Sequence, residues 1–444
     1  MRGIEGALFA LRGVREGKTA AETLRTLGSR LPVKELSLAS SLVYMALRRE
    51  AAWRRIFTSR LRKGRSDNSR DMAPLVSDCL LLGTAGLLEL RHFAGGVLVN
   101  GLLEALKDGG QAKAVPLVNA ILHYVSEHGG EEMEKLRRSP NLEDRALWAG
   151  IPVWSLPAWK KSWTAADLNE LFDLMRIAPC ASLRTSPGER EGMLATLAAN
   201  GVEAAPSELF PDSVRLASTI LPTLVPGFSQ GRATVQTEGS MLAASLVKEF
   251  WRGGLIVDMC SGRGVKAAQI AQSLPDSRVE CWELSSGRHL AAVGEMNRLG
   301  VASRVALRVG DALTLSPSEK PTLVFLDAPC SGSGTWNRKP ESKWKLNWMK
   351  LDKICESQSA LLRRALTLTG AGGIIIYVTC SLLRQENENI VASVLSEHPD
   401  CVVLDVPWRG NHLRRGRPWG VYIWPNQPWL DGFYVSVIMK RAEA

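Results

Sequence analysis

The sequence predicts a multi-domain protein whose three parts differ in fold class: an all-α part at the N-terminus, a small α+β part, and an α/β domain at the C-terminus. The chain has 444 residues, which predicts roughly three domains at about 150 residues each. Up to about residue 130, apolar residues recur at helical intervals, whereas from about residue 231 short apolar strands alternate with helices. That alternation is typical of a mostly parallel sheet covered by helices.

Residues 1–135 are predicted to be helical throughout. Apolar residues stand at helical spacing in the segments 39–57, 80–93, 97–110 and 116–130. The last two segments end in paired glycines, which stop helices. The basic stretch RLRKGRSDNSR, residues 60–70, is interpreted as a loop that is either a solvated connection or a contact for phosphate groups.

The middle of the chain is predicted to contain a linker and a small α+β unit. Residues 136–165 carry prolines and tryptophans without a clear period, which is typical of a linker. Residues 166–230 combine the helical segments AADLNELFDLM and REGMLATLAANG with short strands such as CASLRTS, which indicates an α+β subdomain.

The α/β domain, residues 231–444, opens with a strand, a glycine turn and a helix. In GGLIVDMCSGRGVKAAQIA the strand covers 255–258, and the turn presents backbone N–H groups and the positive end of a helix to a ligand. Gly262, Gly264 and Ala267 satisfy the dinucleotide pattern G-x-G-x-x-G/A. By itself this turn leaves NAD(P) and S-adenosylmethionine as alternatives.

Three acidic residues stand at the ends of the first three predicted strands, Asp258, Glu283 and Asp311. Each one alone could cap the helix that follows it. Because ligands of open α/β sheets bind at the carboxyl ends of strands, the three together favour a ligand site. In this interpretation Glu283 binds both hydroxyls of a ribose and Asp311 binds an adenine amino group, so the ligand contains a nucleoside.

The fourth and fifth strands each end in a Cys-Ser pair, Cys330 after LDAP and Cys380 after YVT. Both thiols are therefore expected at the same sheet edge as the nucleoside site, and Asp327 precedes Cys330 by three residues. Since free cysteines are often buried in cores, either cysteine alone leaves a structural role open.

A basic loop with two tryptophans follows Cys330. Its cations and aromatic residues are Arg338, Lys339, Lys343, Lys345, Trp336 and Trp344. Such a loop suits a phosphate backbone with bases to stack on, and its positive field is expected to lower a nearby thiol pKa. Together these parts indicate methyl transfer to a pyrimidine: one thiolate adds to carbon 6 and makes carbon 5 nucleophilic, a carboxyl shares a proton with the ring, and the second thiol assists release.

The composition favours a nucleic-acid partner. The net charge is +10 and the pI is about 9.3. Eight cysteines without a C-x-x-C pair or a His cluster predict neither a zinc site nor a disulfide framework, which fits a reducing cytoplasm. No signal peptide and no membrane-spanning stretch is recognised, so a cytoplasmic location without a membrane partner is expected.

Several segments resemble the motifs of one family. DAPCSGSGTWNRKPESKWK resembles a D-A-P-C-S-G motif, TCSLLRQENENIV a T-C-S…E-N-E motif, GRATVQTEGSMLA the opening of the catalytic domain, and PWLDGFYVSVIMK a D-G-F-F strand. These are motifs of the bacterial ribosomal RNA cytosine-5-methyltransferases of the Sun (RsmB) type, within the Nop2/Sun family. LVYMALRR and PLVNAIL resemble the NusB RNA-binding fold.

The resemblance implies a domain order and partners. It implies a NusB-like helical RNA-binding domain (1–135), a linker (136–165), a small α+β RNA-binding subdomain (166–230) and a Rossmann-like class I methyltransferase domain (231–444). It implies S-adenosylmethionine as the cofactor and RNA, above all 16S ribosomal RNA, as the partner. A monomer is expected.

The resemblance also implies residue roles. Cys380 would be the nucleophile, Cys330 would assist release, and Asp327 would contact the base or the cofactor. The implied cofactor-binding residues are Cys260, Ser261, Gly262, Arg263, Gly264, Val265, Lys266, Glu283, Asp311 and Asp327.

Two departures from the family pattern keep alternatives open. The usual C-A-A-P-G-G-K-T loop is CSGRGVKA here, with Arg263 and Val265 intruding, and the usual Arg-x-Asn is LRTS. A chain that had lost its cofactor would be an RNA-binding or ribosome assembly factor, and transfer RNA would be methylated by the same chemistry. An NAD(P) dehydrogenase, supported by GRGVKA alone, leaves both cysteines unexplained.

Overall fold

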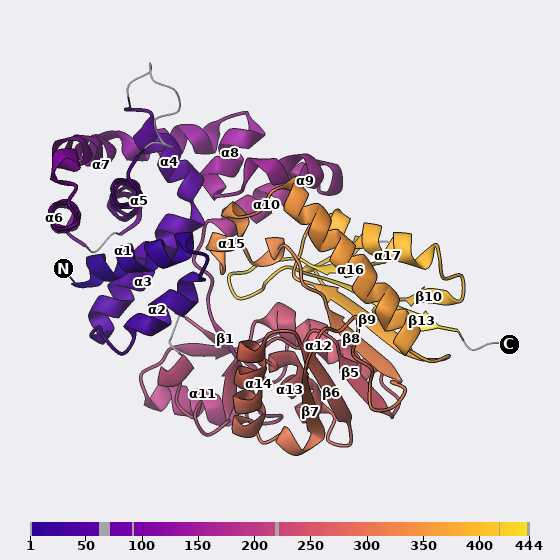
Figure 1. Ribbon diagram of the computed structural model, residues 1–444. Helices are drawn as coiled ribbons and strands as arrows, with labels where there is room; N and C mark the ends of the chain where they lie inside the picture. Colours follow the sequence, from indigo (N-terminus) through magenta and orange to yellow (C-terminus); the bar gives the residue numbers. More distant parts are fainter. Residues whose placement is uncertain (1, 62–71, 91–92, 218–221, 417, 442–444) are drawn as a thin grey trace. The chain divides into compact units, whose positions relative to one another are not determined.

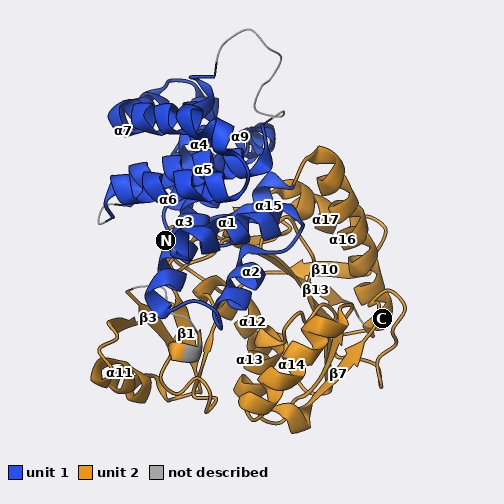
Figure 2. Ribbon diagram, turned by 60° about the vertical axis from the view of Figure 1, so that its left-hand side comes forward, with its two compact units in different colours: residues 1–178, 336–345 blue, residues 179–335, 346–444 orange. Residues whose placement is uncertain are grey.

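A computed structural model gives the structure of the protein, and it describes residues 2–61, 72–90, 93–217, 222–416 and 418–441. Most of the predicted basic loop at 60–70 lies outside these residues. The chain divides into two compact units, residues 1–178 with 336–345 and residues 179–335 with 346–444 (Figure 2). Among the described residues, no helix is long and apolar enough to cross a bilayer.

The described residues of the first unit form helices only (Figure 1). The helices are α1 (Arg2–Arg15), α2 (Ala20–Leu27), α3 (Val33–Arg48), α4 (Glu50–Thr58), α5 (Pro74–Glu89), α6 (Gly95–Asp108), α7 (Val115–Arg138), α8 (Leu142–Ala149), α9 (Leu156–Ser162), α10 (Ala165–Met175) and α15 (Pro340–Trp344), with 3-10 turns η1 (Ala112–Ala114) and η2 (Val153–Ser155). Helix α3 packs on α1, and α5 packs on α7, around a core that includes the buried Trp53 and Phe57.

Residues 136–165, interpreted above as a linker, are largely helical and belong to the first unit. Gly150 adopts the left-handed conformation that ends α8. Pro157 stands in the first turn of α9, where its missing N–H breaks no helical hydrogen bond. Trp159 is fully buried. The prolines and tryptophans that obscured the period therefore start a helix and fill a core.

The second unit contains a small antiparallel sheet with the strand order β2-β3-β1-β4. Its elements are β1 (Ser182–Thr185), α11 (Arg190–Ala199), β2 (Ala204–Pro206), β3 (Ser213–Leu216), η3 (Pro222–Leu224) and β4 (Ala233–Val235). Leu183 pairs with Val235, so β4 completes this sheet although the sequence analysis placed it in the next domain. Helix α10, predicted as part of the α+β subdomain, lies in the first unit.

The large sheet of the second unit has the order β11-β12-β13-β9-β8-β5-β6-β7, with β10 also paired to β13. Its strands are β5 (Leu255–Asp258), β6 (Arg278–Glu283), β7 (Val305–Val309), β8 (Leu323–Asp327), β9 (Ile374–Thr379), β10 (Cys401–Leu404), β11 (Leu413–Gly416), β12 (Gly420–Ile423) and β13 (Phe433–Lys440). Strands β5 to β9 pair in parallel, whereas β10 to β13 pair antiparallel, including β13 with β9. The predicted α/β domain is thus present, but its sheet is mixed, so the expectation of a mostly parallel sheet holds only for β5 to β9.

Helices cover both faces of this sheet (Figure 1). The covering helices and turns are α12 (Glu238–Phe250), α13 (Val265–Ser273), α14 (Ser286–Arg298), η4 (Ala302–Arg304), η5 (Ser333–Thr335), α16 (Trp348–Leu368), η6 (Arg384–Glu386) and α17 (Glu388–Leu395). Figure 1 shows α12, α13 and α14 on one side and α16 with α17 on the other. The strand order reverses at β5, between β6 and β8, and ligands of such sheets bind at the carboxyl ends of the strands at this point.

Candidate active site

The carboxyl ends of the parallel strands bring predicted site residues to one edge of the sheet. Asp258 ends β5, Glu283 ends β6 and Asp327 ends β8. Cys330 follows β8, and Cys380 directly follows β9. Because these strands run in the same direction, five residues that are far apart in the sequence start from the same edge.

The turn after β5 depends on two left-handed glycines. Gly262 has a φ of +59° and Gly264 has a φ of +77°, conformations that glycine adopts without strain. A Cβ on Gly264 would lie 2.3 Å from the Cε atom at the end of the Met296 side chain, so this side chain would have to move to admit a larger residue. The Arg263 side chain, which departs from the family pattern, is exposed, and Val265 begins α13. The altered loop therefore keeps a tight turn with backbone N–H groups at a helix N-terminus.

The Glu283 carboxylate makes local contacts but does not cap the next helix. Its Oε1 atom accepts a hydrogen bond from the backbone N–H of Ser285 at 2.7 Å and pairs with Arg288 at 2.8 Å. The helix cap is Ser285, whose hydroxyl accepts from the N–H of Arg288. The capping alternative is thus excluded for Glu283. A carboxylate at the end of β6 beside a glycine turn fits the ribose of a nucleoside cofactor.

Asp311 and Asp258 differ from Glu283. Asp311 is exposed, and its Oδ1 atom accepts a hydrogen bond from the N–H of Leu313 at 2.9 Å, which stabilises a local turn. Asp258 is only 1% exposed, and burial, followed by the charge of Asp327, raises its pKa to about 7 against the opposing effect of Lys266. Asp311 is therefore accessible from solvent, whereas Asp258 is buried below the edge of the sheet.

The two cysteines meet. The Sγ atoms of Cys330 and Cys380 lie 3.2 Å apart, although the residues come from different strands. The hydrogen bond with Cys380, burial, and the charges of Cys380, Glu386 and Asp327 raise the pKa of Cys330 well above its ordinary value. The expectation that the basic loop lowers the pKa of a nearby thiol is therefore wrong for Cys330, which stays protonated at neutral pH.

Lys266 interacts with two of the predicted site residues, Asp327 and Cys380. Its Nζ atom contacts the carboxylate of Asp327 at 2.6 Å and lies 5.4 Å from the centre of the Phe433 ring. Burial lowers the pKa of Lys266, but Asp327, Cys380 and Asp258 raise it, and the net change is upward. The sequence analysis placed Lys266 in the cofactor loop; the structure adds its ion pair with Asp327 and its electrostatic interaction with Cys380.

The basic loop predicted to contact RNA is largely part of the helical unit. The Trp336 ring lies 6.1 Å from the ring of Trp154 and 5.5 Å from that of Trp159, and it is fully buried. Lys343 is fully buried and donates from Nζ to the backbone oxygen of Arg48 at 2.7 Å. Burial, followed by the charges of Arg48 and Arg49, lowers the pKa of Lys343 well below its ordinary value.

Trp344 shares this environment, since its Nε1 atom donates to the backbone oxygen of Leu47 at 2.6 Å. Lys339 and Lys345 are exposed. The interpretation as a stacking and phosphate-binding loop is thus wrong for Trp336, Lys343 and Trp344. Cations and aromatic residues on a loop resemble a nucleic-acid contact in sequence even when they pack inside a domain.

Sequence reasoning missed the residues that hold the cysteine turns. Asn387 accepts a hydrogen bond from the Thr379 hydroxyl at 2.6 Å and donates to the backbone oxygen of Ser381 at 2.9 Å, so it braces both neighbours of Cys380. Glu386 lies beneath both turns. These two residues belong to the E-N-E motif that the sequence analysis noted. The distance of this motif from Cys380 along the chain does not indicate which groups its side chains bind.

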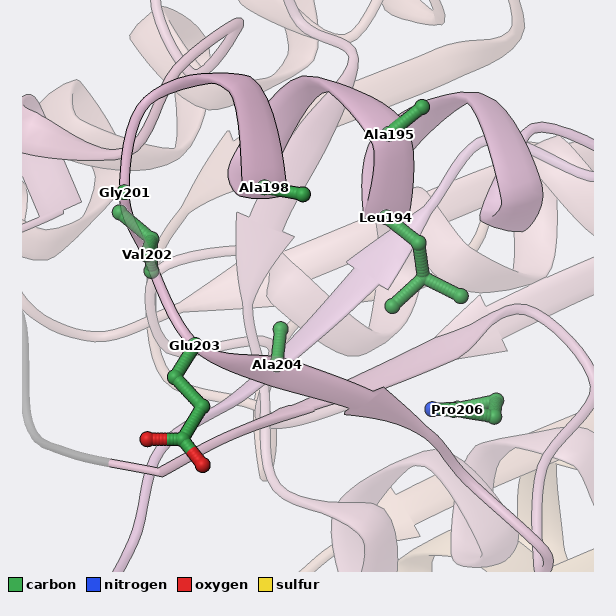
Figure 3. Close-up of a pocket in the computed structure, with 8 residues that line it drawn as sticks. All are labelled: Leu194, Ala195, Ala198, Gly201, Val202, Glu203, Ala204 and Pro206. Atoms are coloured by element: carbon green, nitrogen blue, oxygen red, sulfur yellow. The ribbon is translucent and has the colours of Figure 1, made fainter.

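An open pocket elsewhere in this unit contains none of the predicted site residues (Figure 3). It has a volume of about 610 Å³ and lies between α11 and β2. Its lining residues are Leu194, Ala195, Ala198, Gly201, Val202, Glu203, Ala204 and Pro206. The lining is apolar apart from Glu203 and carries no part of the chemistry described above.

A Rossmann-like sheet that presents a glycine turn and two adjacent thiols at its carboxyl edge defines a cofactor-dependent transferase domain. Residues 248–439 match the family described as 16S rRNA methyltransferase RsmB/F, and over this range the chain is a methyltransferase domain of the RsmB/F type. The resemblance of the catalytic motifs to the RsmB/Sun type is thereby confirmed, the dehydrogenase alternative is excluded, and S-adenosylmethionine is the cofactor. The NusB-like character of residues 1–135 stays a prediction.

Relatives and solved structures agree with this assignment. Ribosomal RNA small subunit methyltransferase B of Yersinia pseudotuberculosis serotype O:1b (strain IP 31758) is 26% identical over 330 residues, which cover 73% of each chain. The crystal structure of PH0851 has a TM-score of 0.78 at 21% identity and covers 99% of this chain and 98% of its own. NSun6 from Pyrococcus horikoshii with SFG has a TM-score of 0.58 at 16% identity, covering 66% of this chain and 99% of its own. At these identities the two structures establish a shared fold.

Proposed function

We propose that this RNA methyltransferase transfers a methyl group from S-adenosylmethionine to carbon 5 of a cytosine in 16S ribosomal RNA. The observation that carries the proposal is the 3.2 Å approach of the Cys330 and Cys380 thiols, together with the ion pair between Lys266 in the first turn of α13 and Asp327 at the end of β8. Two adjacent thiols suit a reaction in which one sulfur bonds the base and another assists release.

Each catalytic group has a distinct task in this proposal. The thiolate of Cys380, favoured by the Lys266 cation, adds to carbon 6 of the cytosine. Asp327 lies at the ring nitrogen and shares a proton there, which offsets the charge that develops on the ring. Bound S-adenosylmethionine would supply an electrophilic methyl group, which bonds to carbon 5 as its bond to the sulfonium sulfur breaks and S-adenosylhomocysteine leaves. The proton on carbon 5 then passes to solvent water as the bond from carbon 6 to the Cys380 sulfur breaks. The protonated Cys330 assists this release by donating a hydrogen bond to the departing Cys380 sulfur.

The cofactor is held by the turn from Cys260 to Lys266, with Glu283 on the ribose and Asp311 at the adenine. The positive-φ glycines and the carboxylate of Glu283, which does not cap a helix, support this placement. The proposed RNA-binding parts are the NusB-like residues 1–135 and the small α+β subdomain. The net charge of +10 supports RNA as the partner, and a cytoplasmic monomer is proposed.

The substrate proposal rests on the family described as 16S rRNA methyltransferases and on relatives named for the small ribosomal subunit. The test is transfer of labelled methyl groups from S-adenosylmethionine to unmodified 16S ribosomal RNA, with transfer RNA in parallel. Label in 5-methylcytosine of 16S RNA supports the proposal. Label in transfer RNA alone would mean that transfer RNA, and not 16S ribosomal RNA, is the substrate. Tight RNA binding without label or heat of cofactor binding supports the assembly-factor alternative instead.

A further inference from the structure

The carboxylate of Glu386 is fully buried between the two cysteine turns. Its Oε1 atom accepts a hydrogen bond from the backbone N–H of Ser331 at 2.7 Å and one from Nε2 of Gln358 at 3.1 Å. Its Oε2 atom accepts hydrogen bonds from the hydroxyls of both Ser331 and Ser381. Four donors therefore converge on one carboxylate. Burial raises the pKa of Glu386, and the hydrogen bonds from Ser331, Ser381 and Gln358 oppose this rise.

The two serines directly follow the two cysteines, Ser331 after Cys330 and Ser381 after Cys380. The chain thus ends two strands in a Cys-Ser pair, and one buried carboxylate binds both serines. Each serine is at most 3% exposed, so these hydroxyls face the interior while the half-buried thiols lie on the site. A rotation of either turn would break a hydrogen bond to a buried charge.

The strand ladder by itself does not set the distance between the thiols. The pairing of β8 with β9 ends at Asp327 opposite Val378, before either cysteine. Beyond that point, the N–H of Ala328 donates to the oxygen of Val378, and the N–H of Gly334 donates to the oxygen of Cys380.

The Ser333 hydroxyl also joins the segments, because it accepts from the N–H of Leu382 at 2.8 Å and lies 3.0 Å from the Ser381 hydroxyl. Glu386 joins the two turns at the serines that directly follow the two cysteines.

We propose that Glu386 is a positioning residue that fixes the approach of the Cys330 and Cys380 thiols by clamping the serine of each turn. The relevance of this positioning to catalysis rests on the proposed function, whereas the positioning itself rests on the hydrogen bonds of Glu386. The negative charge has a second effect, because it contributes to the raised pKa of Cys330 and so keeps this thiol protonated.

Glu388 provides a matched control from the same segment. It is 4% exposed, and its carboxylate accepts a hydrogen bond from the hydroxyl of Tyr422 and pairs with Arg384. Its described contacts include neither serine. Glu388→Gln therefore removes a buried carboxylate from the same motif and leaves the clamp in place.

The first test measures thiol approach without methyl transfer. Diamide, a diazene oxidant, takes two electrons and two protons from a pair of thiols as the S–S bond forms, and peptide mapping identifies the Cys330–Cys380 link. We expect Glu386→Ala to slow this link by about tenfold or more, because an ångström of misplacement has effects of this order. Glu388→Gln should react within about twofold of wild type. A folded Glu386→Ala protein that forms the link at the wild-type rate would overturn the proposal.

The second test separates positioning from general stability. Ser331→Ala with Ser381→Ala removes the clamped hydroxyls and keeps the test available should Glu386→Ala fail to fold. Glu386→Ala and the double serine variant should each lower kcat for methyl transfer while leaving KM for RNA nearly unchanged. In a Cys380→Ser background, Glu386→Gln should shift the pH profile of Cys330 alkylation to lower pH, and an unshifted profile counts against the charge effect. If the wild-type protein transfers no methyl group, the proposed function is refuted. The rate of disulfide formation still tests whether Glu386 positions the two thiols.

Discussion

Replacing Lys343 with methionine tests whether this lysine belongs to a core or to an RNA-binding loop. Lys343 is fully buried, and its Nζ atom donates to the backbone oxygen of Arg48. Burial and two neighbouring arginines lower its pKa well below the unfolded value. Methionine keeps the length and the apolar stem while removing the ionisable group.

Two free-energy contributions determine whether Lys343→Met raises or lowers the stability of the protein. Each unit by which the folded-state pKa lies below the unfolded pKa costs about 1.4 kcal/mol of stability at neutral pH. The lost Nζ hydrogen bond contributes about 1 kcal/mol. A pKa of Lys343 well below its ordinary value therefore makes Lys343→Met more stable than the wild type at pH 7.

The pH dependence gives an independent readout. Between the two pKa values the unfolded chain binds one more proton at this residue, so the stability of the wild type rises with pH by up to about 1.4 kcal/mol per pH unit. Lys343→Met should remove this rise. Urea denaturation from pH 7 to pH 10 measures both effects, with the difference between variant and wild type isolating Lys343 from other groups.

RNA binding completes the test. Lys343→Met should leave RNA affinity and its salt dependence unchanged, because the ammonium group does not reach solvent. The exposed Lys339 is the matched control, and Lys339→Ala should reduce the salt slope by about 0.7 if this residue contacts a phosphate of single-stranded RNA. A destabilised Lys343→Met protein with a reduced salt slope would refute the assignment of Lys343 to the core.

Three further predictions concern the catalytic domain. Cys380→Ala should abolish methyl transfer, whereas Cys330→Ser should accumulate a slow-migrating protein–RNA adduct on denaturing gels; full activity of Cys380→Ala would contradict the assigned nucleophile. Gly264→Ala should lower stability by about 1–3 kcal/mol and weaken S-adenosylmethionine binding in calorimetry, because the φ of +77° strains a residue with a Cβ and the Met296 side chain would have to move. Unchanged binding would argue against the turn as the cofactor site. The pKa of Asp258 is raised to about 7, so between about pH 4 and pH 7 the folded protein binds one more proton than the unfolded chain, and the stability of the protein falls as the pH rises through this range. Asp258→Asn should reduce this fall, measured in thermal melts, by up to about 4 kcal/mol. An unchanged dependence of stability on pH would contradict the raised pKa of Asp258.

Much of the catalytic sheet was predictable from sequence because its signals are local. Short apolar runs that end in Asp258, Glu283 and Asp327 mark strands, since a strand buried on both faces is apolar along its length. Parallel pairing then brings every strand end to one edge, so the meeting of Cys330 and Cys380 follows from the order of strands and helices.

Domain boundaries were less predictable, because they depend on which surfaces bury each other. Residues 136–165 have no clear helical period, yet Trp159 completes a core, and β4 joins a sheet whose other strands come earlier in the chain. The fate of Trp336 and Lys343 illustrates the same limit. Composition describes a basic aromatic loop equally well whether it faces solvent or packs against Trp154 and the end of α3.

By itself, the sequence determined the alternation of strands and helices, the glycine turn and the two strand-end cysteines, because each depends on neighbours within a few residues. The tertiary structure decided that Lys266 pairs with Asp327, that Glu386 binds both serines, and that Lys343 is buried. Apart from the contact between Glu386 and Ser381, these contacts join residues separated by tens to hundreds of positions. Burial and hydrogen bonding at such separations are set by how the chain folds back on itself, and no local pattern encodes them.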